Sequence, residues 1–197
     1  MDSKHNLVES TEVTKTYLGF WIYIMTDCVL FASLFAVYAV LHHNTNGGPG
    51  SSSLFSMPNA LAETLILLTS SFTSGLSMIA ARNNHKVKVI YWLVITFLLG
   101  AAFLFLEIHE FQHLVITGDS WRRSGFLSSY FTLVGTHGLH IAVGLFWMAI
   151  ISLVILKRGL TKKTVKGLTL LNLFWHFLDV IWIFIFSVVY LMGHVGL

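Results

Sequence analysis

The side chains of this chain that could do chemistry are carboxylates placed inside long apolar stretches. Of the nine acidic residues, five lie within or at the edge of such stretches, namely Asp27, Glu63, Glu107, Glu110 and Asp179. A carboxylate that faces lipid at mid-bilayer costs roughly 2.5–3.5 kcal/mol on insertion scales. These groups must therefore face other helices, pair with a partner or hold a proton.

Depth and spacing separate the five carboxylates. At about 1.5 Å per helical residue, Asp27 lies ~15 Å into the first apolar run and Asp179 ~16 Å into the last. Asp27 either takes and releases a proton or forms a hydrogen bond that links two helices, which we call a lock. For Asp179 the lock is favoured. Glu107 and Glu110 share one helical face, and two such close carboxylates rarely both ionise, so both are proton-linked candidates with Asp27. Glu63 starts its helix, where the dipole favours an acid.

Histidines inside the apolar runs are the other candidates. The run H-G-L-H places His137 and His140 in the middle of the fourth apolar segment, and His176 lies in the fifth. Neutral imidazole suits haem iron or copper. His137 and His140 share a face and cannot sandwich one iron, and bulky residues flank His176. We therefore expect no metal at these residues. We expect the three histidines to pair with buried carboxylates such as Asp27 and so to cross-link helices, as Asp179 does by hydrogen bonding. A di-histidine haem site is the alternative.

Composition identifies the class of protein. The 197 residues are 55% hydrophobic and 11% charged, against about 25% charged in soluble domains. This excludes a solvated globule and a disordered chain, and the net charge of +3 is too small for a nucleic-acid-binding surface. The single cysteine, Cys28, cannot form an internal disulfide. The chain is predicted to be an integral membrane protein.

Five segments are long and apolar enough to cross about 30 Å of hydrocarbon as helices. They are Tyr17–Leu41, Ala60–Ala81, Val89–Ile116, Ser124–Leu156 and Leu168–Met192. The runs are continuously apolar, unlike the alternating strands of a membrane barrel. The fold class predicted is all-α, a bundle of five transmembrane helices in one domain (17–197), preceded by a mobile polar tail (1–16).

The basic residues orient this bundle. Ten lysines and arginines flank one set of segment ends and two, Arg122 and Arg123, flank the other. The excess of positive charge marks the cytoplasmic side, so the amino terminus is expected in the cytoplasm and the carboxyl terminus outside.

Glycines predict where helices pack closely. Gly135, Gly138 and Gly144 in the fourth segment, with Gly75 and Gly100 elsewhere, should let neighbouring helices approach one another.

Four sequence blocks in this order carry a resemblance to a known family. They are G-F-W-I-Y-I-M-T-D-C-V-L-F-A-S-L-F-A-V-Y-A-V-L (Gly19–Leu41), E-I-H-E-F-Q-H (Glu107–His113), G-T-H-G-L-H-I-A-V-G-L-F-W-M (Gly135–Met148) and W-H-F-L-D-V-I-W-I-F-I-F-S-V-V-Y-L-M-G (Trp175–Gly193). The chain resembles subunit III of the haem–copper terminal oxidases, most closely the five-helix form of bacterial cytochrome bo ubiquinol oxidases. It departs from the cytochrome c oxidase form in lacking two further spans and in having Asp27 where that form has Glu.

The resemblance implies a non-catalytic subunit of a respiratory complex in the bacterial inner membrane. The complex would oxidise ubiquinol, reduce oxygen to water and pump protons, with haems and copper in subunit I and no cofactor or catalytic centre in this chain. This subunit would contact subunit I mainly, with subunits II and IV. It would stabilise subunit I, bind phospholipid and support proton uptake.

Another class of protein, a proton-coupled transporter using Asp27 and Glu110, is a further alternative. It predicts inverted repeats with broken helices. The two prolines, Pro49 and Pro58, both lie outside the middle of the apolar runs, which argues against it.

Overall fold

The structure is a computed structural model that describes residues 2–42, 44, 57–118 and 123–191, with side chains from residue 14 onward apart from that of Met57. The described residues are almost all helical, with no strand among them. The helices are α1 (Asp2–Leu41), α3 (Met57–Arg82), α4 (Lys86–Ile116), α5 (Gly125–Arg158) and α6 (Lys162–Ile185). A π-helical turn, η1 (Phe186–Leu191), continues α6.

Local sequence signals set the helix ends. Ser124 caps α5 by accepting a hydrogen bond from the Leu127 backbone N–H at 3.2 Å. Gly159 ends α5 with a φ of 75°, a conformation that glycine adopts without steric cost. Two residues later, Thr161 and Thr164 form a reciprocal capping box that starts α6. The tight α5–α6 connection therefore makes these two helices antiparallel neighbours.

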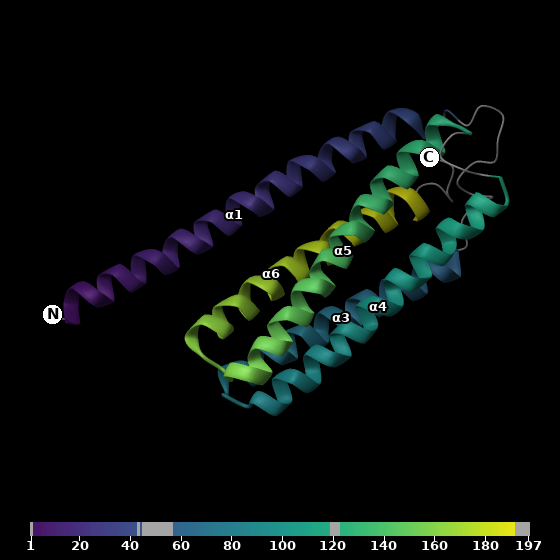
Figure 1. Cartoon of the computed structure of the whole chain (residues 1–197). Helices are drawn as coiled ribbons and strands as arrows, with labels where there is room; N and C mark the ends of the chain where they lie inside the picture. Colours follow the sequence, from purple (N-terminus) through teal and green to yellow (C-terminus); the bar gives the residue numbers. More distant parts are fainter. Residues whose placement is uncertain (1, 43, 45–56, 119–122, 192–197) are drawn as a thin grey trace.

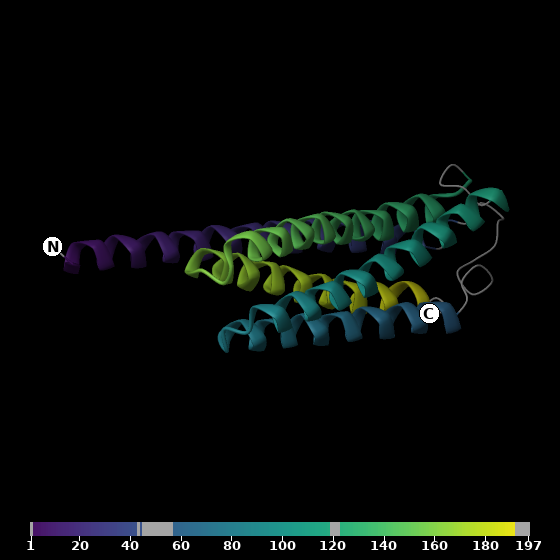
Figure 2. The same cartoon turned by 60° about the horizontal axis from the view of Figure 1, so that its bottom comes forward.

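Four of the helices close into a ring and the fifth lies outside it. Helix α3 packs on α4, α4 on α5, α5 on α6 and α6 on α3, whereas α1 packs mainly on α5 and less on α6 (Figures 1 and 2). The α3–α4 and α5–α6 turns lie at the same end of the bundle. We call this the basic end, because Arg82, Lys86, Lys88, Lys157, Arg158, Lys162, Lys163 and Lys166 gather there.

The centre of the ring is built around Trp175 of α6. Its indole N–H donates to Ser70 Oγ of α3 at 3.1 Å. A Cβ placed on Gly100 of α4 would lie 2.8 Å from the indole, and one on Gly144 of α5 would lie 2.9 Å from it. Glycine is required at both positions because the indole occupies the space of a side chain. The sequence predicted that these glycines bring helices together; the structure shows that two of them do so around an aromatic ring, whereas a Cβ on Gly138 would meet its nearest neighbour at an ordinary 3.8 Å.

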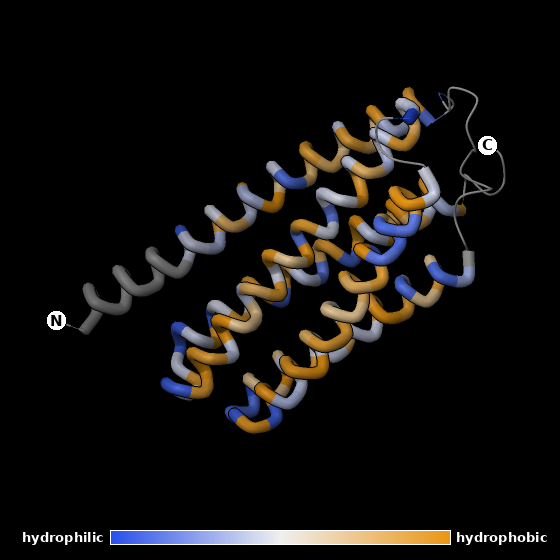
Figure 3. The backbone as a smooth tube through the Cα atoms, turned by 45° about the vertical axis from the view of Figure 1, so that its right-hand side comes forward, coloured by the Kyte–Doolittle hydropathy of each residue, from blue (hydrophilic) through white to orange (hydrophobic). Residues whose placement is uncertain are grey.

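The outer surface of the bundle is apolar. Large side chains such as Val40, Phe146 and Ile116 are more than two-thirds exposed, and hydrophilic residues concentrate toward the helix ends (Figure 3). A soluble protein rarely exposes so much contiguous apolar surface. Five helices are long and apolar enough to cross a membrane, over Thr14–Leu41, Pro58–Arg82, Lys86–Ile116, Gly125–Arg158 and Lys162–Leu191. The predicted fold class, an all-helical bundle of five membrane-spanning helices, is confirmed.

The structure differs from the sequence prediction at two helix starts. The polar residues 2–16 continue α1 as helix instead of forming a separate tail. Helix α6 begins at Lys162, six residues before the predicted Leu168, because the Thr161 cap lies directly after Gly159. In α6 the helix extends past the apolar run as far as its capping residue, Thr161.

Candidate functional site

The first candidate is the carboxylate of Asp27 on α1. Asp27 is 7% exposed, and its Oδ2 lies 3.7 Å from Nε2 of His140 on α5. This is an ion-pair distance and not a hydrogen bond. Tyr23, one turn earlier on α1, also interacts with the Asp27 carboxylate, and His140 Nδ1 lies 2.7 Å from the Thr136 carbonyl. The structure thus brings Asp27 together with one of the three histidines that the sequence offered as partners, and the pair joins α1 to the ring.

His137, one turn before His140, lies in a different environment. It is fully buried, stacked on Trp182 with ring centroids 5.3 Å apart and edge-on to Phe103 at 5.9 Å. Neither of its ring nitrogens has a hydrogen-bond partner. Aromatic rings fill the space beside the imidazole, so the residues present do not fit a porphyrin ligated by His137. A di-histidine haem site that uses His137 does not suit this geometry.

Carboxylates gather a second time near the end of the ring opposite to the basic end. Glu63 of α3 and Glu107 of α4 are both 2% exposed, and neither Glu107 oxygen has a hydrogen-bond partner. Glu110 accepts a hydrogen bond from the Tyr130 hydroxyl at 3.3 Å, and Tyr130 lies 3.1 Å from the Tyr190 hydroxyl of η1. Glu63, Glu107 and Glu110 lie close enough to one another to interact electrostatically. We call Glu63, Glu107 and Glu110 the acidic cluster.

A cavity of about 420 Å³ adjoins the acidic cluster between α3 and α4. Glu63 and Glu110 line it, together with His109 and His113 at successive turns of α4. Sequence reasoning assigned Glu63 to the helix dipole and omitted both tyrosines. The order of the helices could have indicated Glu63. Glu63 lies near the start of α3 and Glu110 near the end of α4. Because α3 and α4 are adjacent and antiparallel, these two positions lie at the same depth in the membrane.

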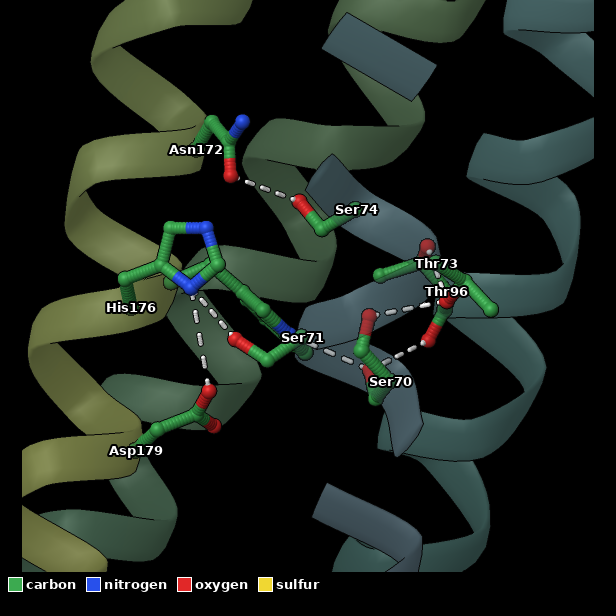
Figure 4. Close-up of polar contacts among 9 residues, drawn as sticks. Ser70, Ser71, Thr73, Ser74, Thr96, Asn172, His176 and Asp179 are labelled. Atoms are coloured by element: carbon green, nitrogen blue, oxygen red, sulfur yellow. Dashed lines mark hydrogen bonds and ion pairs between the residues drawn. The ribbon is translucent and has the colours of Figure 1, made fainter. Parts of the chain in front are cut away.

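A polar seam joins α3 to α6 at mid-membrane (Figure 4). His176 Nδ1 lies 2.6 Å from Ser71 Oγ and 4.0 Å from Asp179 Oδ2. The Ser74 hydroxyl donates to Asn172 Oδ1 at 3.1 Å. His176 and Asp179 both belong to α6, and the contact that crosses to α3 is the one between His176 and Ser71.

A further cavity, of about 320 Å³, lies at the basic end between α5 and α6. Its lining combines apolar side chains such as Trp147 and Ile151 with the charged side chains of Arg158 and Lys163. In the sequence, these basic residues indicate only the orientation of the bundle. An apolar interior with a basic mouth has the chemistry of a site for an anionic headgroup attached to a hydrocarbon chain.

No metal centre is formed by the part of the chain that the structure describes: no three His, Cys, Asp or Glu side chains are grouped so as to hold an ion. The side chains of the candidate groups instead contact neighbouring helices. The fold and these sites define a polytopic helical membrane protein whose ionisable groups lie between its helices.

Comparison with known proteins gives the family. The family described as cytochrome c oxidase subunit III matches residues 3–194. Cytochrome bo(3) ubiquinol oxidase subunit 3 of Pseudomonas aeruginosa is 56% identical over 178 residues, which cover 90% of this chain and 85% of the relative. Cytochrome c oxidase subunit 3 of Bacillus sp. (strain PS3) is 48% identical, covering 91% and 87%, and quinol oxidase subunit 3 of Bacillus subtilis is 46% identical, covering 91% and 88%.

The chain belongs to the cytochrome c oxidase subunit III family. The resemblance stated from the sequence blocks is thereby confirmed, together with the role of a third subunit in a multi-subunit oxidase of the respiratory chain. The protein is a multi-pass membrane protein.

Proposed function

We propose that this chain is the non-catalytic subunit III of a quinol oxidase that oxidises ubiquinol, reduces oxygen to water and pumps protons. The observation that carries the proposal is the similarity over nine-tenths of the chain to a relative named as subunit 3 of a ubiquinol oxidase. In this proposal the haems and copper belong to subunit I. The present chain stabilises subunit I, contacts subunits II and IV, and binds phospholipid.

The location follows from the same proposal. The complex lies in the bacterial inner membrane, with the basic end of the bundle toward the cytoplasm because positive charge is retained there. The amino terminus is then cytoplasmic and the carboxyl terminus faces outside. At the other end of the bundle, Arg123 is the one lysine or arginine among the described residues outside the helices. This low number of positive charges supports the orientation.

In this proposal four polar side chains hold helices together, namely His137, His140, His176 and Asp179. His140 and His176 do so through polar contacts with neighbouring helices, and His137 does so through its ring contacts with Phe103 and Trp182. Asp27, Glu107 and Glu110 are the residues through which the subunit would support proton uptake. For Asp27, the contact with His140 at 3.7 Å favours the lock, since it ties the outlying helix α1 to the ring.

The substitution Asp27→Asn tests the two roles of Asp27. We expect it to lower the stability of the assembled oxidase by about 1 kcal/mol, because the amide loses the charge opposite His140. That corresponds to a thermal dissociation midpoint roughly 2–4 °C lower. Haem content, turnover and pumping stoichiometry should stay near wild type. Asp27→Glu, which keeps the carboxylate, is the matched control; loss of turnover or pumping in a normally assembled Asp27→Asn complex would instead assign Asp27 to proton transfer.

Phospholipid binding is proposed at the cavity of the basic end. Replacing both Arg158 and Lys163 with alanine should remove about 1 kcal/mol of attraction per charge. Retention of anionic phospholipid by the purified complex should then fall roughly thirty-fold. Native mass spectrometry of the complex measures this retention. The control is Lys157→Ala at the same end, which does not line the cavity; equal loss in the control would show that general surface charge, and not the cavity, holds the lipid.

A further inference from the structure

The cavity beside the acidic cluster has a buried floor and an exposed mouth. Glu63 lies at the floor: it is 2% exposed, and its carboxyl oxygen Oε2 has no hydrogen-bond partner. Asn59, His109 and His113 also line the cavity, and all three are exposed. Glu110, which is partly buried, completes the polar lining. A buried acceptor thus lies at the base of a cavity that is open to the surface of the bundle.

The cavity lies close to the ends of the two helices that form it. Glu63 is the seventh residue of α3, and Glu110 is six residues before the last residue of α4. At about 1.5 Å per residue, both lie ~9 Å inside their helix ends. Because the hydrocarbon core is only about 30 Å thick, this depth is just inside its boundary. A polar ligand can therefore enter from the interface without crossing the hydrocarbon.

The lining has more carboxyl groups than fixed positive charges. None of the described residues that line the cavity is a lysine or an arginine. Glu107 lies close enough to Glu63 and Glu110 to interact with both electrostatically, and neither of its own carboxyl oxygens has a hydrogen-bond partner. A buried carboxyl group either holds a proton or has a cation beside it. The cavity provides the space for such a cation.

The size and lining of the cavity indicate which kind of cation fits. A bare metal ion does not fit, since no three His, Cys, Asp or Glu side chains among the described residues are grouped so as to hold one. The volume of about 420 Å³ is in the range of sites for small organic ligands, and Ala62, Leu106 and Leu114 give the cavity an apolar side. A primary ammonium group has three N–H donors for the carboxyl oxygens, and an attached carbon chain would cover the leucines.

We propose that this cavity binds a primary ammonium group carried on an alkyl chain. The N–H groups donate to the carboxylates of Glu63 and Glu110, and the alkyl chain lies against Leu106 and Leu114. Two sources can supply this group, the headgroup of an aminophospholipid in the bilayer and a soluble amine from the aqueous phase. The inference goes beyond the proposed function and does not depend on it, because it uses only side chains of this chain.

Thermal unfolding of the full-length chain, purified in mild detergent with any subunits that stay attached, tests the site with n-butylammonium as the probe. A ligand that binds only the folded protein raises the unfolding midpoint. At about five times its Kd, n-butylammonium should raise the midpoint by roughly 2–4 °C over sodium at equal ionic strength. The neutral analogue 1-butanol should not raise it, because the carboxylates attract the charge.

Two variants and one control assign the effect to the cavity. Glu63→Gln should weaken n-butylammonium binding at least about ten-fold, because it removes a charged hydrogen-bond acceptor. Ala62→Leu fills the cavity from an exposed position without changing its charge, and it should abolish the rise in midpoint. The matched control, Asp27→Asn, removes a buried carboxylate on α1 and should respond as wild type does, each rise being measured from the variant's own midpoint. A wild-type response in Glu63→Gln or Ala62→Leu would overturn the site, and so would an equal rise with 1-butanol or no rise in the wild type.

Native mass spectrometry of the protein extracted from its own membrane separates the two sources. If the ligand is a lipid headgroup, phosphatidylethanolamine retained by the wild type should fall at least about five-fold in both Glu63→Gln and Ala62→Leu. If it is a soluble amine, the three proteins should retain this lipid equally while only the wild type responds to n-butylammonium. Either result supports an ammonium site, and the two differ in the source of the ligand.

Discussion

Replacing Gly144 with alanine is expected to destabilise this subunit by about 1–3 kcal/mol, the range for overpacking a filled core. The new methyl group would lie 2.9 Å from the Trp175 ring and 3.2 Å from Phe174. The indole cannot retreat, since Gly100 lies against its other side and its N–H is bonded to Ser70. The thermal unfolding midpoint in detergent should fall by roughly 2–12 °C, followed by tryptophan fluorescence.

The control for this prediction lies on the same helix. Gly138→Ala adds the same methyl group where the nearest atom, from Leu104, is 3.8 Å away. It should be neutral or stabilising by up to about 1 kcal/mol, because alanine favours helix over glycine. Equal losses in Gly138→Ala and Gly144→Ala would mean that the indole does not set the requirement for glycine.

The second prediction concerns Glu107, which is buried with both carboxyl oxygens unpartnered. Glu107→Met is expected to raise the stability of the subunit by about 1–3 kcal/mol, because an apolar side chain of similar length removes an unsatisfied polar group from the core. The thermal midpoint of the assembled oxidase should rise accordingly. A stability gain with unchanged turnover would leave Glu107 without a proton-linked role in the reaction.

The substitution Glu110→Met, three residues away, is expected to change the stability of the subunit in the opposite direction. The Glu110 carboxylate accepts a hydrogen bond from the buried Tyr130 hydroxyl, so its removal should cost about 1 kcal/mol. If Glu107→Met is the more damaging of the two substitutions, the Glu107 carboxyl must have a partner in the assembled complex, and the prediction is wrong.

The fold could be predicted from the sequence because the membrane simplifies the problem. Backbone groups in hydrocarbon must bond within a helix, so five apolar runs determine five helices. The order of packing around the ring could not be predicted in the same way. It depends on which face of α6 meets which glycine, and the fit of Trp175 between Gly100 and Gly144 is a long-range match of shapes.

The sequence alone could single out individual residues of the candidate sites, but it could not predict which of them lie together. Asp27, Glu107, Glu110 and His176 stand out because ionisable side chains are rare in apolar runs. Their partners depend on helix rotation: His140 turns to Asp27 while His137, three residues away, turns inward to Trp182. The rotation of α5 about its axis decides which of the two histidines faces Asp27, and no spacing rule fixes that rotation.

The position of α1 outside the ring has a consequence for biogenesis. Helix α1 leaves the ribosome before its main neighbour α5, and α3 and α4 are made between them. Until α5 inserts, Asp27 has no His140 beside it, and only the apolar side chains around it hold α1 in the bilayer. The long apolar run around Asp27 is thus what retains α1 in the bilayer while the remainder of the polypeptide is translated.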